Sequence, residues 1–280
     1  MIRPLLAIVL VAPPMLFALG RPGPVVDDNV ALASRYLELL SEDRLDALAP
    51  LLAETAVYTD PTSERFGGRP RHFQGREAIL GHFRTARSSP SVLRIDESFA
   101  SGDEVVLWTS YLSTPKTGLL EDPGPPHAET TTLRVLTRVR IENGLVREHV
   151  DYVDYDSLLA ALDPQSESEN RDPDPLARGR KEFAALHGAD PSAVLARLSP
   201  GCVADFGAKA ESSLRELLAA SPLPSTPRLA PERAFASKDW YVLGWVAGAR
   251  RGVSVFRIGP EGVDRWLERV EDQRERPRRR

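Results

Sequence analysis

Two stretches of the chain, Phe99-Ala-Ser-Gly-Asp-Glu-Val-Val-Leu-Trp108 and Phe235-Ala-Ser-Lys-Asp-Trp-Tyr-Val-Leu-Gly244, follow one pattern. Each begins with Phe-Ala-Ser, turns near an Asp and continues into a β-prone apolar run. Later, Arg140-Ile-Glu-Asn-Gly144 recurs as Arg257-Ile-Gly-Pro-Glu-Gly262, which predicts a hairpin with a glycine-containing turn in each copy. The period far exceeds the roughly 20–50 residues of a solenoid repeat. The sequence therefore predicts a tandem duplication of one complete globular fold.

The composition is that of an ordinary globular protein. The chain has 280 residues, 42% of them hydrophobic and 27% charged, with a net charge of −4, so it is long enough for two cores of typical domain size. Basic residues gather only at the end, which predicts a frayed tail at 273–280. The sequence shows no basic face with aromatic residues, so we expect no nucleic-acid partner. Cys202 is the only cysteine, which excludes an intrachain disulfide.

The first twenty residues have the pattern of a secretory signal peptide. Arg3 precedes an apolar run, and the small residues Ala18 and Gly20 favour cleavage after Gly20. The run is shorter than the about 20 residues of a membrane span. We therefore expect an extracytoplasmic protein, periplasmic or secreted. The alternative is an uncleaved N-terminal anchor, in which case the protein would contact a membrane.

The first unit, expected at 27–162, has helices first and strands after them. Apolar residues at helical spacing, among them Leu32, Tyr36 and Leu40, predict that one stripe of the first helix faces a core. The proline at position 61 predicts that an early strand ends at Asp60. The further elements that we expect are helices at 45–52 and 76–87 and strands at 57–59, 93–100, 104–113, 130–141 and 145–153.

A linker rich in Ser, Glu, Asn and Pro, at 163–175, precedes a shorter second unit at 176–272. This order of elements predicts an α+β fold in each unit, a curved antiparallel sheet packed on about three N-terminal helices. The elements that we expect in the second unit are helices at 177–186, 192–198 and 208–220 and strands at 228–236, 240–247, 253–258 and 263–270.

Four strings carry a family resemblance: Arg35-Tyr36-Leu-Glu-Leu, Val57-Tyr58-Thr59-Asp60-Pro61, Gly75-Arg-Glu-Ala-Ile79 and Gly144-Leu-Val-Arg-Glu-His149-Val-Asp151-Tyr152. Together they resemble the SnoaL-like branch of the nuclear transport factor 2-like superfamily. The first unit matches over nearly its full length, the second only in outline. The resemblance implies a cone-shaped fold, a curved sheet wrapped on three helices, with an apolar pocket at its open end. Such folds host isomerases, cyclases, epoxide hydrolases, dehydratases and noncatalytic modules.

Asp60 and Tyr36 match the strand-end Asp-Pro and the helix-one Tyr of ketosteroid isomerase. The resemblance implies a proton-shuttling base at Asp60 and a hydrogen-bond donor to a ligand carbonyl at Tyr36. An apolar pocket would raise the pKa of such a carboxyl toward values useful for a base. The alternatives are a turn carboxylate that bonds local backbone N–H groups and a core tyrosine with a satisfied hydroxyl.

His149 and Asp151 lie two residues apart on a predicted strand and therefore share one face. Asp151 matches the pocket acid of SnoaL-type polyketide cyclases, and the pair could supply acid–base chemistry near neutral pH. The alternative is a solvated surface pair. The apolar character of Val150 and Tyr152 on the opposite face favours a pocket position for His149 and Asp151.

We expect the ligand to contact Phe83, Trp108, Tyr58 and Leu136, although Phe83 and Trp108 would equally suit a plain core. The protonated oxyanion Asp of ketosteroid isomerase should align with Leu136 or, after a register slip, with Thr137. Neither residue is acidic, which removes one strong donor for steroid-type isomerisation.

The second unit lacks these residues. Phe206 falls where Asp60 would be, and Arg265, Leu267 and Arg269 are expected in place of the His–Asp pair. We therefore expect a degenerate copy that keeps mainly the fold. A tandem copy could offer within one chain the sheet-to-sheet contact of a homodimer, so we expect an intrachain pseudo-dimer and a monomeric chain.

Two functions fit these observations. The first is an exported protein that binds a small apolar, carbonyl-bearing molecule, with proton transfer by Asp60 or by Asp151 and His149. The second is a noncatalytic binding or scaffolding module, so whether the chain is an enzyme stays open. The sequence has no phosphate loop and no Cys/His spacing typical of a metal site, so we expect no cofactor and no metal.

Overall fold

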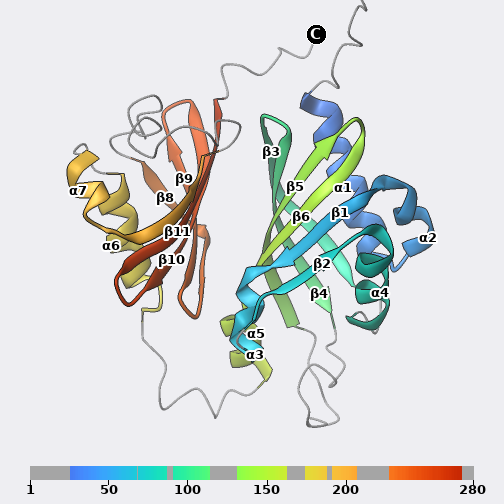
Figure 1. Cartoon of the computed structure of the whole chain (residues 1–280), viewed down its shortest axis with the longest axis horizontal. Coiled ribbons are helices and arrows are strands. Elements are labelled where there is room, and N and C mark those ends of the chain that lie inside the picture. Colours follow the sequence, from blue (N-terminus) through green and yellow to red (C-terminus); the bar gives the residue numbers. More distant parts are fainter. Residues whose placement is uncertain are drawn as a thin grey trace, which may run out of the picture.

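The computed structural model places two units side by side (Figure 1). The predicted leader at 1–20, the helix at 208–220, the tail at 273–280 and most of the linker lie outside the described residues. Within the part that is described, no helix combines the length and the apolarity that crossing a bilayer needs. The structure describes residues 26–67, 69–86, 91–113, 131–162, 174–187, 191–206 and 227–272.

The first unit has helices before, between and after the strands of a mixed sheet. Its helices are α1 (Val26–Ser41), α2 (Leu45–Leu48), α3 (Glu64–Gly67), α4 (Arg76–Ala86) and α5 (Tyr155–Leu162), with 3-10 turns η1 (Ala49–Leu51) and η2 (Pro61–Ser63). Its strands are β1 (Leu52–Asp60), β2 (Arg71–Gln74), β3 (Val92–Ser101), β4 (Glu104–Ser113), β5 (Thr131–Glu142) and β6 (Leu145–Val153). They pair in the order β2-β1-β6-β5-β4-β3.

The second unit repeats this plan in smaller form. It contains α6 (Ala177–Leu186), α7 (Pro191–Leu195), β7 (Leu198–Asp205), β8 (Arg228–Ser237), β9 (Trp240–Ala247), β10 (Arg250–Gly259) and β11 (Gly262–Asp272). The order β7-β11-β10-β9-β8 matches the first sheet without β2. The register also shifts at equivalent places, between Arg140 and Ile141 and between Arg257 and Ile258. The α+β class and the two sheets are confirmed.

The sheets depart from the predicted antiparallel arrangement at one equivalent pair. Strand β1 runs parallel to β6, and β7 runs parallel to β11. Strand β7 was not predicted because Pro200 and Gly201 are typical of turns, and β7 lies at a sheet edge, where proline is tolerated. The predicted helix at 45–52 is shorter, because α2 ends at Leu48 and Leu52 already belongs to β1.

Both hairpins that the repeated sequence predicts are present. The β5–β6 turn places Asn143 and Gly144 at φ values of 53° and 74°, a conformation that Asn and Gly adopt most readily. The β10–β11 turn places Gly262 at φ 122°. A Cβ atom there would lie 2.5 Å from the carbonyl oxygen of Arg197, so this position requires glycine.

The core of the first unit lies between the helices and the inner face of the sheet. Tyr36, Leu37 and Leu40 of α1 are almost fully buried, which confirms the predicted apolar stripe. They meet alternate residues of the strands, including Val105 and Val139, in one apolar cluster. Alternation along the strands sends their neighbours to the opposite, outer face.

The outer faces of the two sheets pack against each other. The ring of Trp108 meets that of Phe235 edge-on, with centroids 6.2 Å apart, and Tyr152 lies 5.6 Å from Trp240. This interface cluster contains Phe99, Val106, Trp108, Leu136, Val150 and Tyr152 of the first unit and Phe235, Trp240, Val242, Val253, Val255 and Leu267 of the second. The intrachain contact is thus a sheet-on-sheet apolar face.

Two arginine contacts cross this interface in a reciprocal way. The Arg251 guanidinium lies over the Phe99 ring at 5.4 Å, and the Arg134 guanidinium lies over the Phe235 ring at 5.8 Å. Strand registers make Phe99 equivalent to Phe235, and Arg134 equivalent to Arg251. Arg251 also donates to the carbonyl of Ser98 at 3.0 Å, and Arg134 donates to the equivalent carbonyl, at position 234, at 3.2 Å. Such exchange of equivalent contacts is the property of a two-fold interface.

The interface also contains residues that differ between the units. Glu104 accepts from Arg138 at 2.6 Å and pairs with Arg269 of the second unit, which is 1% exposed. The strand position equivalent to Trp108 is Gly244, where a Cβ atom would lie 3.3 Å from the Trp108 ring. Each of these residues therefore has a different residue type at the equivalent position of the other unit.

Double-mutant cycles on unfolding test the reciprocal contact. Combining Arg134→Gln with Phe235→Leu, and Arg251→Gln with Phe99→Leu, should give couplings of about 0.5–2 kcal/mol each, the range of a partly desolvated cation–π pair. The diagonal combinations, Arg134 with Phe99 and Arg251 with Phe235, are the control and should be additive. Coupling in one cycle and none in the other would contradict a reciprocal interface.

Candidate functional site

Polar residues interrupt the apolar inner face of the first sheet. Thr137 of β5 and Asp151 of β6 are directly paired across the two strands. Val139, the next residue of β5 that faces inward, already belongs to the core cluster that packs on α1 and α4. In the other direction, Val135 and Val153 belong to a separate apolar cluster. The polar pair therefore lies between two apolar regions of the inner face.

A chain of hydrogen bonds runs from the core to Asp151. The Tyr36 hydroxyl lies 3.0 Å from His149 Nδ1, and His149 Nε2 lies 2.9 Å from Asp151 Oδ1. The Thr137 hydroxyl donates to the same Oδ1 at 2.7 Å. The predicted His149–Asp151 pair therefore forms inside the cone, together with Tyr36, rather than on a wet surface.

The contacts fix the tautomer of a neutral His149. An ionised carboxylate only accepts hydrogen bonds, so Nε2 must carry the proton that points at Asp151. Nδ1 then accepts from the Tyr36 hydroxyl. All donors in the chain consequently point toward the carboxylate and hold Asp151 in one orientation.

Exposure differs along the chain. The side chain of His149 is 1% exposed and that of Asp151 is 17% exposed, while Tyr36 is fully buried. Tyr58 donates to Asp151 Oδ2 at 3.4 Å, which is longer than the contacts at Oδ1. Burial, and next the charge of Asp151, raise the pKa of Tyr58 well above its usual value. Tyr58 therefore keeps its proton and remains a donor beside the carboxylate.

Aromatic rings form one wall next to Asp151. The Tyr58 ring packs edge-on against Phe83 with centroids 5.2 Å apart, and it stacks on His82 at 5.3 Å. His82 in turn stacks on Phe73 of β2 at 4.2 Å. Phe73 and His82 are half-buried, whereas Tyr58 and Phe83 are buried. The wall thus places the predicted contact residues Tyr58 and Phe83 beside the polar chain.

Asp60 has the contacts of a turn carboxylate. It ends β1 as predicted and is 0% exposed. Its Oδ1 accepts from the Thr62 hydroxyl at 2.7 Å and from the Ser63 amide at 3.0 Å, while Oδ2 accepts from the Tyr155 hydroxyl at 2.6 Å. Burial raises the pKa of Asp60, although these hydrogen bonds oppose the rise. The capping interpretation therefore describes its geometry, and a base role stays a prediction.

Two of the predicted contact residues lie on the wrong face of the sheet. Trp108 and Leu136 belong to the interface with the second unit and do not face the polar chain. The correction follows from strand alternation, because Thr137, one residue after Leu136, is the residue paired with Asp151. From the sequence, Thr137 is offered only as the alternative to Leu136 after a register slip.

Other residues of the site carried no usable signal in the sequence. Tyr155 begins a short helix that was not predicted, and its hydroxyl also accepts from Arg71 at 2.9 Å. His82 and Phe73 come from a helix and from a four-residue strand that meet only in the folded chain. A pattern of spacing within one element cannot reveal such a cluster.

The second unit has a buried carboxylate at the position equivalent to Asp151. Glu268 pairs with Ser254 across β10 and β11, and the Ser254 hydroxyl donates to it at 2.6 Å. Trp245 Nε1 donates to the other oxygen at 2.7 Å, and Glu268 is only 2% exposed. The expectation that Arg265, Leu267 and Arg269 replace the His–Asp pair was therefore wrong by one register position. The equivalent residues are Trp266 and Glu268, and Phe206 does occupy the place of Asp60.

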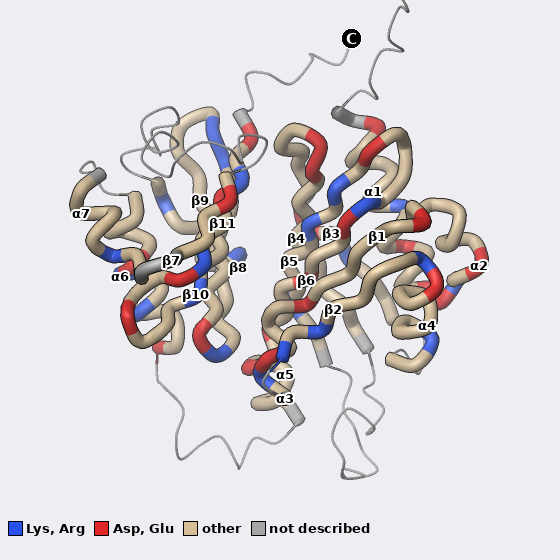
Figure 2. Tube along the Cα trace, in the orientation of Figure 1, with Lys and Arg blue, Asp and Glu red and all other residues tan. Residues whose placement is uncertain are grey.

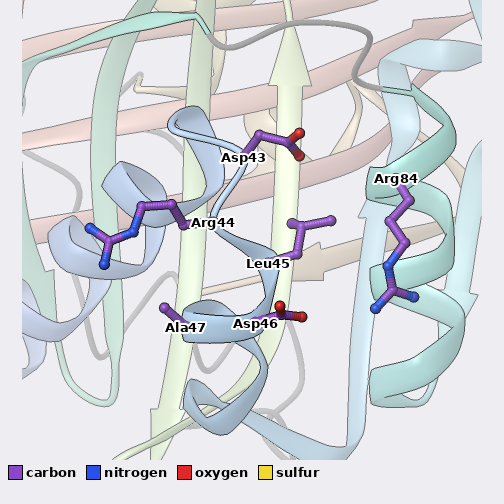
Figure 3. A pocket seen from close by; sticks show the side chains of 6 residues that line it. All are labelled: Asp43, Arg44, Leu45, Asp46, Ala47 and Arg84. Atoms are coloured by element: carbon purple, nitrogen blue, oxygen red, sulfur yellow. The ribbon is translucent and has the colours of Figure 1, made fainter.

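A separate groove lies on the first unit between α2 and α4 (Figure 3). It measures about 480 Å³. The carboxylates of Asp43 and Asp46 point toward α4, which contributes Arg84. The predicted site residues do not line this groove. Among the described residues, no group of three or more His, Cys, Asp or Glu side chains is placed to hold a metal ion.

A known family matches much of the first unit. The model of the SnoaL-like domain matches residues 33–149. The match includes Tyr36, Asp60 and His149 and stops two residues before Asp151. The first unit is therefore a SnoaL-like domain, which confirms the resemblance found in the sequence. No curated protein matches the chain significantly.

Solved structures of similar fold cover about half of the chain. A candidate SnoaL-like polyketide cyclase from Shewanella putrefaciens CN-32 is 20% identical, covers 49% of this chain and 97% of its own, and has a TM-score of 0.43. An LEH-like epoxide hydrolase from M. tuberculosis is 16% identical over 50% of this chain and 92% of its own, with a TM-score of 0.39. A ketosteroid isomerase-like protein from Catenulispora acidiphila DSM 44928, in complex with trimethylamine, is 20% identical over 47% and 91%, with a TM-score of 0.39.

The raised pKa of Asp60 predicts a pH-dependent effect of Asp60→Asn. The folded state favours the protonated carboxyl, so this contribution to stability is present below the ordinary pKa of 3.8 and is lost as pH rises through the folded pKa. Asn stays uncharged and loses nothing. Urea unfolding between about pH 4 and pH 7 should therefore show the stability advantage of the natural chain over the variant shrinking with pH.

Asp103→Asn, in an exposed turn, is the control and should show no such trend. An advantage of the natural chain over Asp60→Asn that grows with pH would contradict the raised pKa.

Proposed function

We propose that the first unit binds a small, largely apolar molecule with a carbonyl group, and that Asp151 transfers a proton to or from it. The observation that carries this proposal is the polar chain itself, because its exposed end is the carboxylate and its other members are buried donors. A carboxylate beside an aromatic wall that accepts from Tyr58, Thr137 and His149, all of them buried, is typical of a functional site.

The first chemical step would be removal of a proton from the carbon next to the carbonyl. The C–H proton passes to Asp151 Oδ2, whose contact with Tyr58 is the longest and is therefore the one a ligand can most readily replace. The electron pair of the C–H bond moves onto the carbonyl oxygen and gives an enolate. His149 and Thr137 hold Oδ1 during this step and keep the carboxylate oriented.

The enolate oxygen needs a donor, and Tyr58 is in place to be one. Its raised pKa keeps the hydroxyl protonated next to Asp151, and such a preoriented donor lowers the energy of a developing oxyanion. Return of the proton to a different carbon would complete an isomerisation. Attack of the enolate carbon on a second carbonyl would instead close a ring, as in a cyclase.

The alternative is noncatalytic ligand binding by the same pocket or an interaction role of the fold. It is favoured by Thr137, a neutral residue that faces inward where ketosteroid isomerase has an acidic oxyanion donor. A bound molecule retained through purification, found by native mass spectrometry without any turnover, would support this second function.

We also propose that the second unit arose by tandem duplication and takes the place of a second subunit, which leaves the chain monomeric. The shared strand order and the equivalent register shifts support the first statement. The reciprocal arginine contacts support the second, because they satisfy within one chain the outer face that would otherwise need a partner.

Asp151→Asn tests the proposed chemistry with 5-nitrobenzisoxazole, which loses a ring proton to a base, breaks its N–O bond and gives a coloured phenolate. The variant should lower kcat/KM by about 100-fold or more, the usual contribution of a positioned base. Because Asn keeps an acceptor oxygen for Thr137 and His149, stability should fall by only about 1 kcal/mol.

The matched control is Glu268→Gln, which changes the equivalent carboxylate of the second unit. Turnover of 5-nitrobenzisoxazole should not change in this variant. Full activity in Asp151→Asn would rule out Asp151 as the base.

The N-terminal segment is proposed to direct export and to be removed after Gly20. Its short apolar run and small residues before the junction support this assignment. The protein can be expressed with its N-terminal segment and collected from the medium or the periplasm. Its intact mass should then be that of a mature chain that starts at Arg21. A mature chain that retains Met1 would show an uncleaved anchor instead.

A further inference from the structure

Helices α3 and α5, called the cover below, lie at one end of the first sheet, on the side near the second unit (Figure 1). Phe66 of α3 packs edge-on against Tyr155 of α5, with ring centroids 4.6 Å apart. Tyr155 joins Val135 and Val153 of the sheet in one apolar cluster. Val153 is the next residue of β6 after Asp151 that faces inward. The cover therefore borders the proposed site directly.

The second unit contacts both helices of the cover. Asp156 of α5 accepts from the backbone N–H of Lys238, in the β8–β9 turn, at 2.8 Å. Arg257 of β10 donates to both carboxylate oxygens of Glu64, in α3, at 3.1 and 3.2 Å. Within the cover, Arg65 of α3 donates to Asp156 at 3.0 Å. Figure 2 shows acidic and basic residues together where α3 and α5 lie.

Arg257 is itself held firmly in the second unit. Asp264 accepts from its Nε at 2.8 Å and from Nη2 at 2.9 Å. Its guanidinium lies over the Trp240 ring at 5.7 Å, and Trp240 packs on Tyr152 in the interface between the sheets. The contact on Glu64 is therefore continuous with the buried interface rather than an isolated surface pair.

Hydrogen bonds within the first unit also hold the cover in place. Tyr155, at the start of α5, donates to Asp60, and Arg71 donates to the Tyr155 hydroxyl. Burial, and next the charge of Asp60, raise the pKa of Tyr155 well above its usual value, so the hydroxyl stays a donor. These contacts give Asp60 and Tyr155 a role as positioning residues for α5.

We propose that the second unit braces α3 and α5 over the end of the ligand pocket and thereby sets how often the pocket opens. The part of this inference that concerns access rests on the proposed function of Asp151. The brace gives the degenerate copy a task that needs no chemistry of its own. It also explains how residues more than eighty positions away in sequence act on the pocket.

The strength of the brace is modest. Arg257 and Glu64 are 26% and 21% exposed, and a partly exposed ion pair changes an opening equilibrium by no more than about five-fold. Opening of α5 would be a local event below global unfolding. A contact of this strength tunes the fraction of open molecules without locking the pocket shut.

Hydrogen exchange of the full chain tests the brace. Glu64→Gln and Arg257→Gln should each speed exchange of the amides at 155–162 by about two- to five-fold. The double variant should exchange no faster than the faster single variant, because both changes remove the same contact. Arg147→Gln is the matched control, since Arg147 bonds Thr55 elsewhere in the first unit and its loss removes the same charge. Unchanged exchange at 155–162 in all variants would overturn the proposal.

Turnover of 5-nitrobenzisoxazole separates the brace from the chemistry. If both proposals hold, Glu64→Gln and Arg257→Gln should change KM by about the same factor as they change the exchange rate of the amides at 155–162. The value of kcat should stay nearly constant. Faster exchange in a chain that shows no Asp151-dependent turnover would support the brace and contradict the proposed function. Faster exchange with an unaltered KM would contradict control of access.

Discussion

The packing of one sheet face against the other is the contact on which the rest of the molecule depends. Each sheet has apolar side chains on two faces, and the helices that the structure describes in each unit pack on the inner face. The outer face of the first sheet, with Trp108 and Tyr152, is covered by Phe235 and Trp240 of the second. This burial occupies the apolar part of the outer face, whereas Asp151 lies on the inner face with Thr137.

The inner face contains polar and charged side chains that are held by hydrogen bonds. A buried polar group is tolerated when each of its hydrogen bonds is made, and the chain from Tyr36 through His149 to Asp151 meets this condition with its donors in one direction. In the second unit the same sheet position holds Glu268, bonded by Ser254 and Trp245. A buried carboxylate is thus common to both units, but only Asp151 retains appreciable exposure. The second copy therefore keeps an acid at this position, although Trp266 and Phe206 stand where the first has His149 and Asp60.

The sequence predicted elements with strong local signals and missed those whose meaning depends on distant partners. Strands β4, β6 and β9 and helix α6 begin and end where the apolar pattern and the turn residues indicate. Of the site, His149 and Asp151 share a face because alternation along a strand is a local property. Trp108 and Leu136 were assigned to the pocket because one strand alone does not tell which face a partner covers. Tyr155 could not be found at all, since its role requires β1 and α5 to meet.

The central claim is that the two units form one cooperative body through the interface between the sheets. Differential scanning calorimetry of the full chain tests it most directly, because a shared interface makes both cores unfold together. The account predicts one transition whose calorimetric enthalpy equals the van't Hoff enthalpy, and Phe235→Ala should move that single transition down. Two independent transitions, of which Phe235→Ala shifts only one, would contradict it.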